Sequence, residues 1–356
     1  MQMLSQLGLI LLMFQIGLQF AFAHLTERHN RRAVTAIASA SMIAPFALGF
    51  GFGWFTAPLL SPGVDRLASA LFIATAFSIT ALPILGRIMM EFKLTRLPIG
   101  VIAISSAAIN DVVGWLLLTL VTALTLAEFS AAGFALKVAL VGAFFLVWWF
   151  AVRPLMKRVI HLTQAGPVPV GEKAGRGKLT HTLLGIVLAG IFISAMTTYQ
   201  LGIFAIFGGF MMGVILHDEH ELIEAWKERI GHFVMVFFLP IFFTYTGLRT
   251  HVGSLDTLEA WGWCGLLIGL ATLGKFGASY LAARWVGMSH QEGKVIGIMM
   301  NTRALMELIV INVGFDLGVI SQQVFTMLVL MAIFSTVITT PGLRRWLPKM
   351  GVAVAH

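Results

Sequence analysis

The sequence predicts an all-α polytopic membrane protein. Of the 356 residues, 58% are hydrophobic and only 11% are charged, and the mean hydropathy is +0.90. Because a soluble globular domain carries about 25% charged residues, this composition excludes a water-soluble enzyme and a disordered chain. Long apolar runs, separated by connections that alternate between basic and non-basic, indicate helices that cross a bilayer repeatedly.

About eleven apolar runs are candidate transmembrane helices, since a span needs about 20 apolar residues. They are expected near residues 3–23, 34–56, 67–90, 99–124, 131–152, 181–199, 202–217, 231–249, 259–286, 292–314 and 321–341. The only long connection, 153–180, contains Gly166, Pro167 and Pro169, which favour a flexible linker. The polar stretch 218–230 carries apolar residues at helical spacing and is expected to be a short interfacial helix.

Basic residues gather in alternate connections. The connections after the first, third, fifth, seventh and ninth runs, together with the C-terminal tail, hold 19 of the 24 Lys and Arg residues. The other connections hold only Arg66 and Arg249. The positive-inside rule then places the N-terminus outside and the C-terminus in the cytoplasm. It also accounts for the net charge of +8 without a nucleic-acid partner.

Two groups of glycines are expected to be structural. Gly49, Gly51 and Gly53 alternate in the second run, and Gly209 and Gly213 are four residues apart in the seventh. Small residues let membrane helices approach closely. Neither group follows a strand, so neither is interpreted as a phosphate-binding loop.

Four charged residues lie deep within the runs: Asp111, Lys275, Arg303 and Glu307. A charge at the bilayer centre costs about 2.5–3.5 kcal/mol on insertion scales, so such groups face a cavity or one another and indicate an ion or proton pathway. Lys275 is either a counter-charge for Asp111 or a lysine that extends to the interface. Arg303 and Glu307 are four residues apart, and an intrahelical salt bridge would satisfy both.

Asp111, preceded by Asn110, is the main candidate for binding an ion. Removal from water favours the protonated form of a carboxylate. Such a group binds a proton or a small cation but not both at once, and this competition is the physical basis of cation/proton exchange. The alternative is that Asp111 only caps or pairs with a neighbouring helix.

The third run contains hydroxyl groups followed by a proline. Pro83 removes one backbone hydrogen bond and disfavours helix immediately before it. The hydroxyls of Thr75, Ser78 and Thr80 can satisfy the freed carbonyls or coordinate a dehydrated cation, as in the broken helices of secondary transporters. A simple kink without an ion site is the alternative.

Four segments carry a resemblance to a known family. Ser78–Arg87 and Ser106–Trp115 resemble the monovalent cation:proton antiporter-2 family, in the variant close to plant cation/H+ exchangers and their bacterial relatives. Leu239–Arg249 and Asn301–Val310 look like further landmarks of that family. The landmarks follow the family's order, and the match extends over essentially the whole chain.

The resemblance implies a sodium/proton antiporter fold of inverted repeats, in which two broken helices cross. The third and tenth runs would be the crossing pair, and the family's first two helices would be absent. One membrane transport domain would cover 1–356. Its expected parts are a dimer or scaffold side at 1–33 and 181–250, an ion-binding core side at 34–130 and 259–341, and a linker helix with a cytoplasmic loop at 131–180.

For function, the resemblance implies a secondary antiporter that exchanges Na+ or K+ for H+ and is not an enzyme. Asp111 and Asn110 match the family's ion-binding pair, and Lys275 matches its core lysine. Because electrogenic members carry an acidic residue at the Asn110 position, the neutral Asn110 implies electroneutral exchange. The core would move like an elevator within a homodimer in a bacterial inner membrane, with no cofactor. The alternatives are a truncated, non-transporting member and a cation channel or efflux pathway.

Overall fold

The computed structural model describes residues 2–18, 31–94, 97–126, 131–164, 181–201, 205–303 and 305–351. Within these ranges the chain forms helices and turns, without a strand. Contacts divide it into two compact units. The first unit is Met1–Ala21 with Leu126–Leu248, and the second is Phe22–Thr125 with Arg249–His356.

Six described helices are long and apolar enough to cross a membrane, or seven if the bent pair His220–Gly231 and Val234–Ser254 is one span. Other predicted runs correspond to shorter apolar helices, such as Met3–Leu18 and Ala205–Ile215. The count of about eleven spans therefore stays a prediction. The linker predicted at 153–180 begins as helix, and its part from residue 165 lies outside the described residues.

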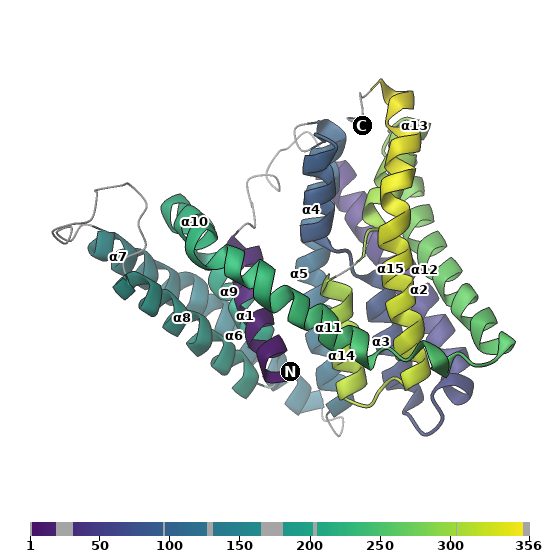
Figure 1. The fold of residues 1–356 in the computed structure, drawn as a ribbon, viewed down its shortest axis with the longest axis horizontal. Coiled ribbons are helices and arrows are strands. Elements are labelled where there is room, and N and C mark those ends of the chain that lie inside the picture. The colour runs from purple at the N-terminus through teal and green to yellow at the C-terminus, as the bar shows by residue number, and fades with distance from the viewer. Residues whose placement is uncertain are drawn as a thin grey trace. The chain divides into compact units, whose positions relative to one another are not determined.

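The first unit is built from helices at the start and in the middle of the chain (Figure 1). These are α1 (Gln2–Leu18), α6 (Ala131–Val147), α7 (Arg153–Gln164), α8 (His181–Gln200), α9 (Ala205–Ile215), α10 (His220–Trp226) and α11 (Leu239–Arg249). A π-helical turn, Trp148–Val152, continues α6 into α7, and the turns Lys227–Gly231 and Val234–Phe238 lie between α10 and α11.

The stretch 218–230 is helical from His220, as expected, but is not a separate short helix, and its position at the interface stays a prediction. Helical structure continues from α10 through the π-helical turns into α11, with a bend of 45°. Its apolar residues are covered by protein: Leu222 and Trp226 are buried. The Trp226 ring meets Phe14 of α1 edge-on, with ring centroids 4.6 Å apart. The apolar spacing therefore reflects packing of this segment against α1.

Close contact between α1 and α9 depends on glycine, as predicted for Gly209 and Gly213. A Cβ atom at Gly213 would lie 2.2 Å from the carbonyl oxygen of Phe14, and one at Gly209 would lie 2.5 Å from that of Ile10. Real Cβ atoms do not approach so closely, so only glycine permits this packing.

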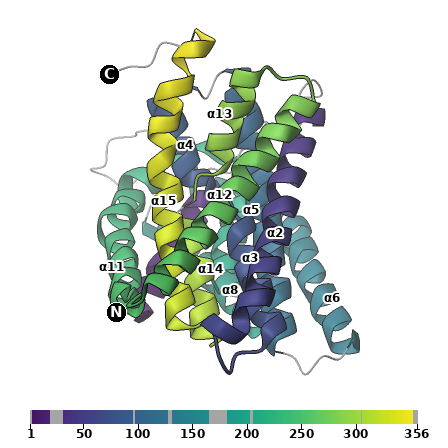
Figure 2. The same cartoon turned by 90° about the vertical axis from the view of Figure 1, so that its right-hand side faces the viewer.

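The second unit contains the remaining helices (Figure 2). They are α2 (Arg31–Leu60), α3 (Arg66–Ser78), α4 (Leu82–Glu91), α5 (Pro98–Leu126), α12 (Leu258–Trp285), α13 (His290–Met300), α14 (Leu305–Asp316) and α15 (Gln322–Trp346), with short 3-10 turns at Val252–Ser254 and Pro348–Met350. Figure 2 shows α2 beside α3 and α12, with which it makes extensive contacts. Side chains that accept a hydrogen bond from the first turn cap α3, α12, α13 and α15.

Two helices of this unit are broken, and the breaks meet. One break separates α3 from α4 at residues 79–81, and the other follows α13 at residues 301–303 and precedes α14. The backbone N–H of Ala81 donates to the carbonyl oxygen of Thr302 at 3.1 Å. The third and tenth predicted runs are thus the broken pair. Pro83 falls in the first turn of α4, where its missing N–H has no intrahelical acceptor to lose.

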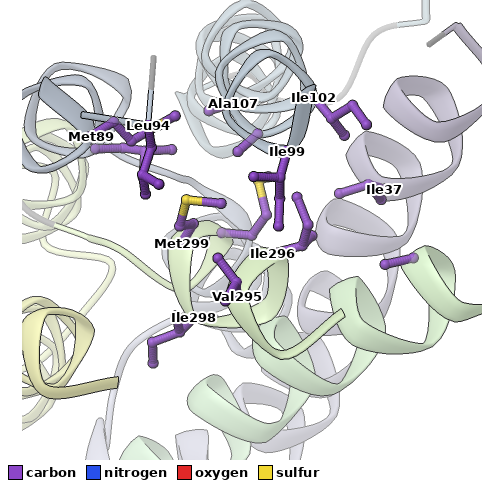
Figure 3. Packing of buried hydrophobic residues seen from close by; sticks show 14 of the residues in the cluster. Ile37, Met89, Leu94, Ile99, Ile102, Ala107, Val295, Ile296, Ile298 and Met299 are labelled. Atoms are coloured by element: carbon purple, nitrogen blue, oxygen red, sulfur yellow. The ribbon is translucent and has the colours of Figure 1, made fainter. Parts of the chain in front are cut away.

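An apolar core holds the α4 and α13 side of the breaks in place. Figure 3 shows α13 contributing Val295, Ile296 and Met299 to this core, together with residues of α2, α4 and α5. Ile296, Met299 and Met89 of α4 are completely buried. Because close-packed interiors leave little room for movement, this packing holds α4 and α13 in place. The polar residues at the breaks are therefore held in place as well.

Candidate ion-binding site

The candidate site centres on Asp111 in the middle of α5. Its side chain is 1% exposed, and neither carboxylate oxygen has a hydrogen-bond partner. No ion pair to it is found within the described part of the chain. The backbone amide of Leu82, the first residue of α4, faces the carboxylate without reaching hydrogen-bond geometry. A helix N-terminus carries partial positive charge, which favours an anion there.

Asn110 is held by hydroxyl groups from two other segments. Its side-chain nitrogen Nδ2 donates to Ser41 Oγ of α2 at 2.7 Å and to Thr80 Oγ1 in the first break at 3.3 Å. Its carbonyl oxygen Oδ1 is buried without a partner. The sequence did not single out Ser41, because serines are common in apolar helices and the partner of Ser41 is 69 positions away.

The three predicted hydroxyl residues are all buried but differ in what they contact. Thr75 Oγ1 donates to the Leu71 carbonyl at 2.7 Å, and Ser78 Oγ donates to the Thr75 carbonyl at 2.9 Å. Both hydrogen bonds stay within α3. Only Thr80 lies in the break and reaches Asn110. Coordination of a cation by these oxygens stays a prediction.

Lys275 and Arg303 bind the C-terminal end of α3. Arg303 donates from Nη1 to the Ala76 carbonyl and from Nη2 to the Phe77 carbonyl, both at 2.8 Å. Lys275 Nζ donates to the carbonyl of Ser78. The last carbonyls of a helix lack intrahelical partners and carry partial negative charge, which a cation stabilises. Two cations therefore neutralise three successive carbonyls at the break.

This geometry changes the expected role of Lys275. The structure gives no ion pair between Lys275 and Asp111 among the described residues, so the ammonium group acts on Asp111 only through space. The reason is local, because the break exposes the Ser78 carbonyl and Lys275 donates to it. Lys275 is completely buried, so it does not extend to an interface either.

Arg303 and Glu307 form the expected ion pair, with Nη1 and Oε1 3.1 Å apart and both side chains buried. The expectation that this ion pair lies within one helix is wrong. Arg303 lies in the second break, whereas Glu307 lies in the first turn of α14. The pair therefore connects the break to the next half-helix, and Glu307 has a fixed cation that Asp111 lacks.

A cavity of about 420 Å³ in the second unit opens beside Asn110, although Asp111 does not line it. It is lined by Ala38, Ser39, Met42, Ile43, Phe46, Ala47, Ser78, Ile109, Asn110, Val113 and Leu117. Of the predicted site residues, Ser78 and Asn110 line it. A larger hollow of about 780 Å³ between α2 and α12 includes none of them. The smaller cavity is therefore the one that bears on ion access.

A family model described as "Sodium/hydrogen exchanger, transmembrane" matches residues 1–349. The chain belongs to this exchanger family. The resemblance inferred from the four sequence segments is therefore confirmed, as is a multi-pass membrane protein. The family and its named relatives are exchangers and antiporters rather than enzymes.

Relatives of this exchanger-family chain are named as cation antiporters. It is 35% identical to the Na(+)/H(+) antiporter NhaS4 of Synechocystis sp., covering 95% of this chain and 80% of the relative. It is 38% identical to cation/H(+) antiporter 17 of Arabidopsis thaliana, covering 95% of this chain and 40% of the relative. It is 30% identical to K(+)/H(+) antiporter 1 of Saccharomyces cerevisiae, covering 96% and 39%. The chain thus spans about two fifths of the plant and yeast relatives.

A solved structure shares the fold. The sodium proton antiporter MjNhaP1 from Methanocaldococcus jannaschii matches with a TM-score of 0.61 at 14% identity, covering 98% of this exchanger-family chain and 85% of the other. The sodium/proton antiporter fold predicted from the sequence is confirmed by this match.

Proposed function

We propose that the chain is a secondary antiporter that exchanges Na+ or K+ for H+, with the cation and the proton competing for Asp111. One observation carries the proposal: the Asp111 carboxylate is buried without a hydrogen bond or an ion pair in the described structure. A buried charge without a partner is costly. The carboxylate is therefore neutralised either by a proton or by a bound cation.

Contrast within the same unit supports this assignment. Glu307 is also buried, but Arg303 holds it permanently. The cations nearest the first break are both committed to carbonyl oxygens of α3. Asp111 is left as the carboxylate available to an exchangeable cation, and the residue before it, Asn110, lines the cavity.

The proposed exchange is electroneutral, with one cation moved per proton. Asn110 is neutral, so Asp111 is the one carboxylate at the site that changes its protonation. The second unit is proposed as the moving core and the first as the scaffold of a homodimer, a division supported by the two compact contact units. A bacterial inner membrane, with the N-terminus outside and the C-terminus in the cytoplasm, completes the proposal.

The decisive test is dissipation of a pH gradient in everted membrane vesicles when Na+ or K+ is added. We expect the wild type to dissipate the gradient with one or both cations, and Asp111→Asn to fall to the level of vesicles without the protein. Asp218→Asn is the matched control. Asp218 is a carboxylate of the first unit that Arg153 and Lys157 hold, with its pKa lowered to about 2 because their hydrogen bonds outweigh the opposing effect of burial.

Two results would contradict the proposal. Full activity of Asp111→Asn would remove Asp111 from the exchange. No gradient dissipation by a well-inserted wild type would favour the non-transporting alternative.

A further inference from the structure

We infer that Ser41 is a positioning residue for cation binding, which orients the Asn110 amide so that its carbonyl oxygen is free to coordinate the ion. The inference rests on the proposed function and adds a residue to that site. Ser41 lies on α2, outside the family landmarks and outside the two broken helices. Its side chain is completely buried.

The hydrogen bonds of Ser41 favour one orientation of the Asn110 amide. A serine hydroxyl has a single hydrogen, and Ser41 Oγ donates it to the Ala38 carbonyl at 3.0 Å. The Ser41 oxygen can then only accept, and it accepts from Asn110 Nδ2 at 2.7 Å. A reversed amide would require the Ser41 hydroxyl to leave the Ala38 carbonyl and donate to Asn110 Oδ1 instead. The observed orientation of Asn110 keeps both hydrogen bonds, so Ser41 favours it over the flipped one.

The orientation of Asn110 leaves its carbonyl oxygen Oδ1 without a hydrogen bond. Thr80 Oγ1 accepts a second, longer bond from Nδ2, so the donor end of Asn110 faces hydroxyl oxygens. The carbonyl oxygen Oδ1 is left buried without a partner. Buried polar atoms normally have one. Its position on a residue that lines the cavity and precedes Asp111 indicates that a ligand satisfies it.

The orientation matters because the two ends of an amide have opposite polarity. A carbonyl oxygen replaces a water of hydration around Na+ or K+, as backbone carbonyls do in cation filters. An amide NH2 group would repel the same ion. Ser41 thus determines whether Asn110 attracts or repels the cation beside Asp111, although Ser41 itself does not touch the ion.

The test is exchange in proteoliposomes containing the purified full chain, measured against Na+ and K+ concentration. We expect Ser41→Ala to raise the KM for the cation by about 3- to 10-fold, the effect of losing one hydrogen bond, with kcat changed less than about twofold. Ser41→Thr keeps the hydroxyl and should restore the wild-type KM. Thr56→Val is the matched control, because Thr56 is a buried hydroxyl of the same helix that donates only to the Phe52 carbonyl.

A double-mutant cycle separates positioning from a general structural role. If Ser41 acts through Asn110, Ser41→Ala will not raise the KM further when Asn110→Ala is already present. An equal rise in both backgrounds would overturn the inference, and so would an unchanged KM in the single variant.

Thermal stabilisation in detergent by NaCl or KCl, relative to choline chloride, reports cation binding without transport. If the wild type fails to exchange but is stabilised, and Ser41→Ala shifts the salt midpoint upward, the proposed function fails while the inference stands. If the wild type shows neither exchange nor stabilisation, both fail.

Discussion

The two buried carboxylates of the second unit, Glu307 and Asp111, differ in their contacts, and the proposed chemistry depends on this difference. Glu307 contacts Arg303, whereas Asp111 lies without a partner in the described structure. Both residues were identified from sequence because charges in apolar runs are conspicuous. The carbonyl oxygens that bind Lys275 and Arg303 were not identified from sequence, because they are freed only by the helix break after α3, which is 197 residues from Lys275 and 227 residues from Arg303 in the two hydrogen bonds concerned. Ser41 was missed for the same reason.

At this scale, we expect Arg303→Met to destabilise the protein much more than Glu307→Gln. Arg303 bonds to Glu307 and to the carbonyls of Ala76, Phe77 and Ala271. Removing it leaves a buried carboxylate unpaired, which costs about 3–5 kcal/mol. Glu307→Gln leaves Arg303 on the three carbonyls. Thermal unfolding in detergent compares the two variants, and equal losses of stability would contradict this reading of the site.

The helices divide into those that sequence predicts well and those that depend on distant contacts. Long uninterrupted runs such as α2 and α12 match predicted spans, because length and apolar content are local properties. α10 is different, since its spacing alone does not say whether protein or lipid covers the apolar face. Pro83 correctly indicated the first break. The second break contains no proline, and only the family resemblance indicated it.

An element-scale prediction concerns the contact of α1 with α9. Gly213→Ala places a methyl group 2.2 Å from the Phe14 carbonyl and should cost about 1–3 kcal/mol by overpacking. Gly185→Ala in α8 is the control, because a Cβ there meets nothing within 4 Å, and helix propensity favours alanine by about 1 kcal/mol. We expect a lower melting temperature for the first variant and an equal or higher one for the second. A fully stable Gly213→Ala would show that α1 and α9 do not approach this closely.

At the scale of the whole molecule, the alternation of basic connections predicts the orientation in the membrane, whereas the helices alone do not. The number of spans is harder to predict, because a span is recognised by the length of an apolar helix. A span broken into two short helices, such as α3 and α4, does not have that length in either half. The fold class was therefore predictable, whereas the number of spans and their partition into two units depended on tertiary contacts.

Orientation is testable with single cysteines. In a Cys264→Ser background, we expect Lys349→Cys to react with a membrane-impermeant maleimide in everted vesicles and Gly253→Cys to react in right-side-out vesicles. The only native cysteine is buried, so its removal should leave the fold intact. Labelling of both sites from the same side would contradict an N-terminus outside and a C-terminus in the cytoplasm.

Stoichiometry is also a property of the whole transport cycle. If one cation moves per proton, an imposed membrane potential should leave the exchange rate in proteoliposomes unchanged. Clamping the potential with valinomycin and defined K+ gradients, while Na+ drives exchange, measures this directly. A rate that rises with potential would mean net charge movement and would remove Asn110 as the explanation of coupling.

The hydrogen bond from Ala81 to Thr302 has a consequence for how such a chain can change over time. Connections between helices usually tolerate insertions and deletions, because they lie at the surface. Here both connections lie inside the second unit, and a backbone hydrogen bond joins them. One added residue in either would shift a donor away from its acceptor and turn the next half-helix by about 100°. We therefore expect insertions and deletions to be strongly disfavoured in these two short segments, in contrast to an ordinary surface loop.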